Sequence, residues 1–168
     1  MITIRDLKES EIDFLTDMLY ESIHIPENKP DKDKEDLIHS TQLKKYHEGW
    51  GRNGDTALIA INTNNQALGA VWYRLFNECN KGYGYVDHST PELGIAVTEE
   101  ARGMGVGTLL MKKIIHRAIC EGYQSISLSV DPENRNAVHI YKKLGFKDYG
   151  VSGTSITMVY RVKEQANT

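Results

Sequence analysis

The sequence has few of the features that mark membrane, secreted or metal-binding proteins. Its 168 residues contain two cysteines and six histidines, and neither set has the spacing of a metal site or a redox motif. No apolar run approaches the roughly 20 residues needed to cross a bilayer. Residues 1–6 lack the basic-then-apolar layout of a signal peptide. We therefore expect a cytoplasmic protein with reduced thiols, no metal and no membrane partner.

An excess of positive charge is also missing. The formal net charge of −3 argues against nucleic acid as the main partner, because phosphate binding needs a basic surface. Hydrophobic residues make up 40% of the chain and charged residues 26%, which is typical of a globular protein. No repeat, linker or low-complexity segment interrupts the sequence. We expect a single domain over residues 1–168.

The spacing of apolar residues predicts strands and helices in alternation. Strands are expected at 1–5, 56–61, 66–76, 91–97, 125–130, 147–151 and 154–162. Helices are expected at 9–22, 34–49, 105–121 and 134–144. The polar stretch 26–36 and the segment 77–90 are expected to be loops.

The most informative segment is a glycine-rich turn between the strand ending at Val97 and the next helix. Glycines stand at positions 103, 105 and 107, and Arg102 precedes them. Glycine lets the backbone approach a ligand closely, and the free N–H groups at a helix start favour an anion such as a pyrophosphate. The lysine of a P-loop and the third glycine of a dinucleotide loop are both missing, the latter because position 108 is Thr108. The alternative is a turn that serves only helix–strand packing.

The segment from Asn134 to Phe146 predicts a short capped helix. Asn134 is a suitable N-cap, and Gly145 ends the helix. Ala137 and Tyr141 lie one turn apart on the same face, so a small residue stands beside the tyrosine. Considered without its neighbours, Tyr141 is best interpreted as a core aromatic residue.

Together, the two segments resemble the GCN5-related N-acetyltransferase (GNAT) family. The family turn Arg/Gln-x-x-Gly-x-Gly/Ala is matched by Arg102-Gly-Met-Gly105-Val-Gly107, and residues 134–146 match Asn-x-x-Ala-x-x-x-Tyr-x-x-x-Gly-Phe. The resemblance is strong over 91–146, whereas the first half agrees only in the order of its elements. It implies an α/β fold: a twisted mixed sheet of about seven strands, helices on both faces and a V-shaped opening between two central strands.

The resemblance implies a site for acetyl-coenzyme A. The pyrophosphate is expected at the backbone N–H groups of Arg102, Gly103, Met104, Gly105, Val106, Gly107 and Thr108. The pantetheine arm is expected to pair with the backbone of Ile95 and Val97, and Asn134 or Asn136 to contact the arm or hold its turn. Tyr141 is expected to give a proton to the coenzyme sulfur as the thioester breaks.

The expected reaction is direct attack of a neutral amine on the acetyl thioester. The amine must first lose a proton, and Glu92 is the candidate base, acting directly or through water. A structural or solvent-facing carboxylate is the alternative interpretation of Glu92. The N–H of Val97 is a candidate donor to the developing oxyanion.

Three functions remain open at this point. The preferred one acetylates a small primary amine; the others are a protein acetyltransferase for an N-terminus or lysine, and a non-catalytic acyl-coenzyme A sensor. A closed pocket under residues 26–36 would favour a small acceptor, and an open groove would favour a protein. Tyr73, Tyr83 and Tyr85 are candidates for the acceptor pocket. The C-terminal strands often mediate dimers in this family, so a homodimer is a further expectation.

Overall fold

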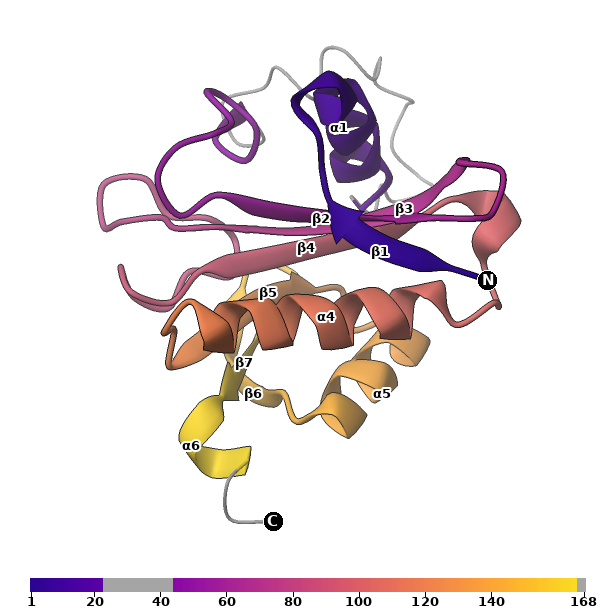
Figure 1. The fold of residues 1–168 in the computed structure, drawn as a ribbon. Coiled ribbons are helices and arrows are strands. Elements are labelled where there is room, and N and C mark those ends of the chain that lie inside the picture. Colours follow the sequence, from indigo (N-terminus) through magenta and orange to yellow (C-terminus); the bar gives the residue numbers. More distant parts are fainter. Residues whose placement is uncertain (23–43, 166–168) are drawn as a thin grey trace, which may run out of the picture.

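The computed structural model describes residues 1–22 and 44–165, and its centre is one mixed sheet (Figure 1). The seven strands have the order β1-β2-β3-β4-β5-β7-β6. They are β1 (Thr3–Asp6), β2 (Thr56–Ile61), β3 (Ala67–Arg74), β4 (Glu92–Val97), β5 (Ser125–Val130), β6 (Lys147–Ser152) and β7 (Ser155–Arg161). Five neighbouring pairs are antiparallel, and β4 with β5 is parallel. The expected α/β fold with a mixed sheet is confirmed.

Helices cover both faces of this sheet, as expected (Figure 1). They are η1 (Glu9–Glu11), α1 (Ile12–Glu21), η2 (Glu99–Ala101), α4 (Val106–Cys120), α5 (Arg135–Leu144) and α6 (Val162–Gln165). In Figure 1, α1 lies above the sheet, and α4 and α5 lie below it. None of the helices in the described part of the chain is long and apolar enough to cross a membrane.

The structure differs most from the sequence prediction at residues 45–50 and near the end of the described chain. Residues 45–50 form turns, so the helix expected over 34–49 is wrong at its end, and the rest of it lies outside the described residues, as does the loop expected at 26–36. The carbonyls of Lys45 and Glu48 accept hydrogen bonds from the Arg74 guanidinium instead of continuing a helix. The short α6 is an additional element that the apolar pattern did not predict.

The alternation of side chains along the strands builds two apolar clusters. Val71 of β3, Leu110 of α4 and Leu128 of β5 belong to the cluster on the α4 face. Leu15 of α1 and Trp72 of β3 belong to the cluster on the α1 face. Burying each such side chain contributes about 1.5–3 kcal/mol. The two clusters therefore fix α1 and α4 on opposite sides of β4.

The parallel strands β4 and β5 are paired only near the start of β4. The N–H of Ser127 donates to the carbonyl of Pro91 at 3.0 Å, and Glu92 lies opposite Ser127 in register. Within the described residues, no further pair joins the two strands, whereas β4 stays paired with β3 from Glu92 to Val97. The predicted separation of the two central strands is confirmed. We refer to the β5-facing edge of residues 93–97 as the open edge of β4.

Candidate active site

The glycine-rich turn joins the end of β4 to the start of α4. Gly103 and Gly105 both have a left-handed backbone, with φ of 82° and 78°, and Gly105 is the N-cap of α4. A Cβ at either position would have no atom of the chain within 4 Å. The turn therefore presents bare backbone to a volume that the described chain leaves open, which is the surface that a phosphate group requires.

Several donors of this turn lack a protein acceptor. In the described part of the chain, no backbone hydrogen bond is recorded from the N–H groups of Gly103, Gly105, Val106, Gly107 and Thr108. The N–H groups of Arg102 and Met104 do have acceptors, the carbonyls of Glu99 and Ala101. Free donors at a helix N-terminus, together with the helix dipole, favour an anion. The exposed Arg102 side chain adds a positive charge beside them.

The open edge of β4 presents unpaired backbone groups. Thr98 donates its N–H to Leu68 of β3 at 2.8 Å, so the alternate residues of β4 direct their backbone groups to the other side. Ile95 and Val97 consequently face the separating β5 strand. An extended chain with amide groups, such as a pantetheine arm, fits such an edge by the hydrogen bonding that adds a strand to a sheet.

Helix α5 brings Tyr141 to the α4 face of the sheet. The tyrosine packs against the core of that face, and its ring centroid lies 6.0 Å from that of Phe146. Burial raises the pKa of the Tyr141 hydroxyl to about 12, so the phenol keeps its proton throughout the neutral range. No hydrogen bond from this hydroxyl to another described residue is recorded. Tyr141 therefore has a proton available for a ligand.

The two asparagines of the α5 segment have different environments. Asn134 is the N-cap of α5, and its side chain accepts a hydrogen bond from the N–H of Ala137 at 3.3 Å. Asn136 is exposed in the first turn of the helix. The structure thus gives Asn134 a local role in holding the turn, which is one of the two roles that the sequence left open.

Glu92 is a buried carboxylate on the opposite face. Only 6% of the residue is exposed, so the solvent-facing interpretation is wrong. Its Oε1 accepts the N–H of Gly84 at 2.8 Å, and its carboxylate is hydrogen-bonded to the Tyr46 hydroxyl. Burial raises the pKa of Glu92 to about 7, while the hydrogen bonds from Tyr46 and Gly84 hold it below the value that burial alone would give. A carboxyl group that titrates near neutrality suits a general base.

The site residues therefore lie on two sides of the separating strands. Glu92 contacts Tyr46, which packs with the α1-face cluster, whereas Tyr141 packs with the α4-face cluster. Two buried hydroxyls, of Thr98 and Ser127, have no hydrogen-bond partner among the described residues. Thr98 follows the open edge of β4, and Ser127 stands opposite its start. The free backbone donors, the open edge and these hydroxyls fit a coenzyme A molecule lying between the strands.

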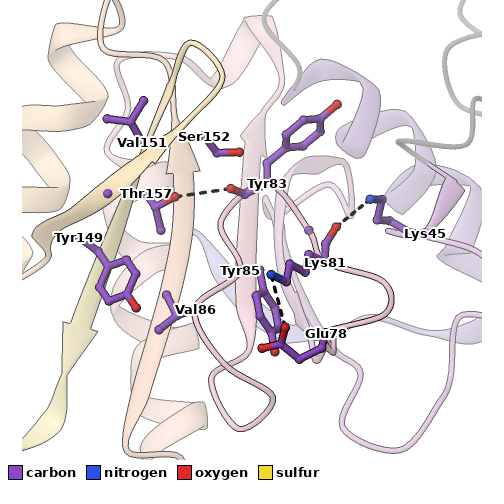
Figure 2. Close-up of a pocket in the computed structure, with 12 residues that line it drawn as sticks. Lys45, Glu78, Lys81, Tyr83, Tyr85, Val86, Tyr149, Val151, Ser152 and Thr157 are labelled. Atoms are coloured by element: carbon purple, nitrogen blue, oxygen red, sulfur yellow. Dashed lines mark hydrogen bonds and ion pairs between the residues drawn. The ribbon is translucent and has the colours of Figure 1, made fainter.

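A hollow of about 490 Å³ lies beside this region, between the segment 78–86 and strands β6 and β7 (Figure 2). Tyr83 and Tyr85 line it, as does Tyr149 of β6. Tyr83 is tied to β7 because its carbonyl accepts a hydrogen bond from Thr157 at 3.5 Å. Tyr73 does not join them, since its hydroxyl donates to Glu121 on the α4 face.

Comparison with known proteins decides the family. A family model described as Acetyltransferase (GNAT) family matches residues 16–146, which is most of the chain. The chain belongs to the GNAT family. The GNAT match contains β2 to β5, α4 and α5, and so includes every residue placed above in the glycine-rich turn, the open edge and the tyrosine helix.

Individual relatives cover parts of this GNAT chain. An uncharacterized N-acetyltransferase of Methanocaldococcus jannaschii is 38% identical over 68 residues, which are 40% of this chain and 30% of that protein. A thialysine N-epsilon-acetyltransferase of Bos taurus is 35% identical over 78 residues, 42% of this chain and 46% of that protein. The chain thus spans less than half the length of both relatives.

A solved structure has the same overall fold. It is a chimera of spermidine N-acetyltransferase SpeG from Vibrio cholerae and hSSAT, with a TM-score of 0.67 and 19% sequence identity. The match covers 99% of each chain. At this identity the likeness concerns the GNAT fold alone.

Sequence reasoning missed the residues that surround Glu92. Tyr46 falls within the helix expected over 34–49, and Gly84 within the loop expected over 77–90. Neither has a local sequence signal for contact with β4, because both contacts arise when loop residues fold back over the sheet. Ser127 was likewise expected only as part of a strand.

Proposed function

We propose that this protein is an N-acetyltransferase that moves the acetyl group of acetyl-coenzyme A to a primary amine. The observation that carries the proposal is the buried Glu92 at the point where β4 and β5 separate, on the face opposite Tyr141. When bound, the coenzyme supplies an activated acetyl group as a thioester. The residues of the chain supply binding, orientation and proton transfer.

The proposed binding site follows the separating strands. The free N–H groups of the glycine-rich turn, with Arg102, hold the pyrophosphate. The backbone of Ile95 and Val97 pairs with the pantetheine amides, and the Val97 N–H is the candidate donor to the thioester oxygen. Asn134 keeps the start of α5 in place.

The proposed proton transfers use one residue on each face. Glu92, in its ionised form, takes a proton from the incoming ammonium, directly or through water. The neutral amine nitrogen then forms a bond to the acetyl carbon, and the carbon–sulfur bond breaks. Tyr141 donates its hydroxyl proton to the departing sulfur. The nitrogen gives up its second proton through water to the tyrosinate left at Tyr141, and Glu92 returns its proton to solvent. The products are an N-acetylated amine and coenzyme A.

A small-molecule amine is the favoured acceptor. The name of the Bos taurus relative, thialysine N-epsilon-acetyltransferase, describes a small amine substrate. Gly82 and Gly84 lie against Glu92 on the α1 face, which restricts the space beside the carboxylate. The distinction between a closed pocket and an open groove depends partly on residues 26–36, which lie outside the described residues.

Thiol release from acetyl-coenzyme A tests the proposal. The panel contains polyamines, lysine analogues, amino sugars and free amino acids, together with peptides that present an N-terminal amine or a lysine. Release stimulated by a small amine, with the acetylated amine detected by mass spectrometry, is the expected result. Stimulation by peptides alone would replace the small acceptor with a protein. Binding of acetyl-coenzyme A without release for any acceptor would favour a sensor.

A further inference from the structure

The Glu92 carboxylate is held by a side chain that comes from a distant part of the chain. The Tyr46 hydroxyl is hydrogen-bonded to Glu92, and the same oxygen accepts the N–H of Tyr83 at 2.6 Å. Gly84 supplies the second donor to Glu92, at 2.8 Å. One phenol oxygen therefore connects the carboxylate to the loop that lies over it. The hydroxyl proton of Tyr46 is directed to Glu92, because the hydroxyl oxygen already accepts a hydrogen bond from the Tyr83 N–H.

The loop leaves no room for change at this contact. A Cβ at Gly82 would overlap the Oε1 of Glu92 and would lie 2.9 Å from the Tyr46 hydroxyl. A Cβ at Gly84 would lie 2.8 Å from the backbone carbon of Leu128 in β5. Both glycines are thus required for the loop to pass between Tyr46 and β5. The Glu92 carboxylate is therefore confined by the loop at Gly82 and Gly84 as well as by Tyr46.

Tyr46 itself is anchored by a buried ion pair. Arg74, only 1% exposed, lies opposite Glu92 in the neighbouring strand and pairs with Asp55 at 2.7 Å. Its Nη1 donates to the carbonyls of Lys45 and Glu48, at 2.9 and 2.8 Å, on both sides of Tyr46. The Arg74 guanidinium thus donates four hydrogen bonds, two to the Asp55 carboxylate and two to these carbonyls. The segment 44–50 is therefore attached to β3 and cannot shift without breaking these bonds.

Aromatic contacts hold the Tyr46 ring in the same place. The ring packs edge-on against Phe76, with centroids 5.1 Å apart, and lies parallel to Tyr83 at 6.3 Å. Neither contact involves the hydroxyl group. Replacement of tyrosine by phenylalanine therefore keeps the packing and removes only the hydrogen bonds.

We propose that Tyr46 is a positioning residue that holds the Glu92 carboxylate in its ionised form for removal of the amine proton. The inference rests on the proposed function of Glu92 as the base. Burial favours the neutral carboxyl, and a phenol that donates to the carboxylate opposes this preference. Tyr46 thus acts on the amine through Glu92 and needs no contact with substrate.

The other polar groups near Glu92 do not replace this donor. Lys45 lies close enough to favour the anion by its charge, but its ammonium group donates to the carbonyl of Lys81. Arg74 is committed to Asp55. Ser127 of β5 lies opposite Glu92, and its hydroxyl has no hydrogen-bond partner among the described residues. Gly84 contributes backbone only.

Tyr46→Phe tests the inference through two independent readouts. The pKa of Glu92 is measured by carbon-13 NMR of its carboxyl group, and the acidic limb of kcat/KM is measured for acetyl transfer. Loss of one hydrogen bond to a charged group is expected to raise both midpoints by about one pH unit or more. The rate on the acidic limb then falls about tenfold, whereas the rate above both midpoints stays within about twofold of the parent.

Tyr73→Phe is the matched control. It also removes a tyrosine–carboxylate hydrogen bond, of 2.7 Å to Glu121, but on the other face of the sheet. Neither the pKa of Glu92 nor the midpoint of the acidic limb of kcat/KM is expected to change in this variant. A measurement on the unmodified protein adds a test that needs no substitution: the carbon-13 shift of the Tyr46 Cζ is expected to titrate with the midpoint of Glu92.

The outcomes separate the inference from the proposed function. An unchanged Glu92 midpoint in Tyr46→Phe, or a uniform fall in rate at all pH values, overturns the positioning role of Tyr46. If the Glu92 pKa measured by NMR rises in Tyr46→Phe but the pH dependence of kcat/KM does not change, the Tyr46–Glu92 coupling is upheld and Glu92 is removed as the base. A raised midpoint in a protein that transfers no acetyl group upholds the coupling and overturns the proposed reaction.

Discussion

Glu92 of β4 lies opposite Ser127 of β5, and this register position is where the two parallel strands part. The backbone of Pro91 still bonds to Ser127 at 3.0 Å, whereas Ile95 and Val97 present their backbone groups to the open edge. A buried carboxylate at the end of a hydrogen-bonded stretch is costly unless it is paired. Here the structure pairs it with donors from Tyr46 and Gly84.

Glu92→Gln is expected to lower kcat about 100-fold or more, because a positioned general base contributes that order of rate. In the parent, kcat/KM is expected to rise with pH and level off above the Glu92 pKa of about 7, since only the ionised carboxylate accepts a proton. In Glu92→Gln this rise of kcat/KM with pH should be absent. Glu121→Gln, which alters a tyrosine-bound carboxylate on the α4 face, is the control and should keep it. A parental pH profile in Glu92→Gln would contradict the assignment.

The same residue makes stability depend on pH. The folded-state pKa of about 7 exceeds the ordinary 4.5, so the native state binds the proton more tightly than the unfolded chain. The contribution of Glu92 to the free energy of unfolding is therefore largest at low pH and declines as pH rises through 7. Between pH 5 and pH 8 the decline is on the order of 2–3 kcal/mol. Urea denaturation at several pH values should show this loss of unfolding free energy in the parent but not in Glu92→Gln. The same pH dependence of the unfolding free energy in both proteins would count against it.

Tyr141→Phe is expected to reduce turnover while sparing coenzyme affinity. The substitution keeps the ring that packs beside Phe146 and removes a proton that the raised pKa of about 12 preserves. We expect a fall in kcat of about 100-fold, with acetyl-coenzyme A binding by calorimetry within about threefold of the parent. Tyr160→Phe, on β7 beside Phe146, is a suitable control. Equal single-turnover rates for Tyr141→Phe and the parent would remove Tyr141 as the acid.

Gly105→Ala tests the pyrophosphate site, and α4 provides a matched control at its other end. Gly105 and Gly122 both have a left-handed backbone, with φ of 78° and 92°, and a Cβ at either meets no atom within 4 Å. Both alanine variants should therefore lose about 1 kcal/mol of stability from backbone strain. Only Gly105→Ala should also weaken acetyl-coenzyme A binding, by about tenfold or more, because its Cβ enters the phosphate position. Equal binding by both variants would place the pyrophosphate elsewhere.

Local signals made half of the site predictable. The glycine-rich turn and the helix with Tyr141 are continuous segments, so the spacing of their residues is enough to predict their local geometry. The Glu92 environment was not predictable in this way. Its pKa depends on Tyr46, whose segment is held by the guanidinium of Arg74 rather than by a helical repeat. Long-range contacts of this kind decide whether a strand carboxylate is a base or a surface charge, and apolar periodicity does not contain them.

The central claim is that acetyl-coenzyme A lies between β4 and β5. Amide chemical-shift mapping of the nitrogen-15-labelled protein during titration with acetyl-coenzyme A tests it most directly. We expect the largest shifts at Ile95, Val97 and the turn from 103 to 108, with small shifts along β1 and β2. Binding that leaves these amides unshifted, or that shifts only residues remote from the open edge of β4, would contradict this placement of the coenzyme.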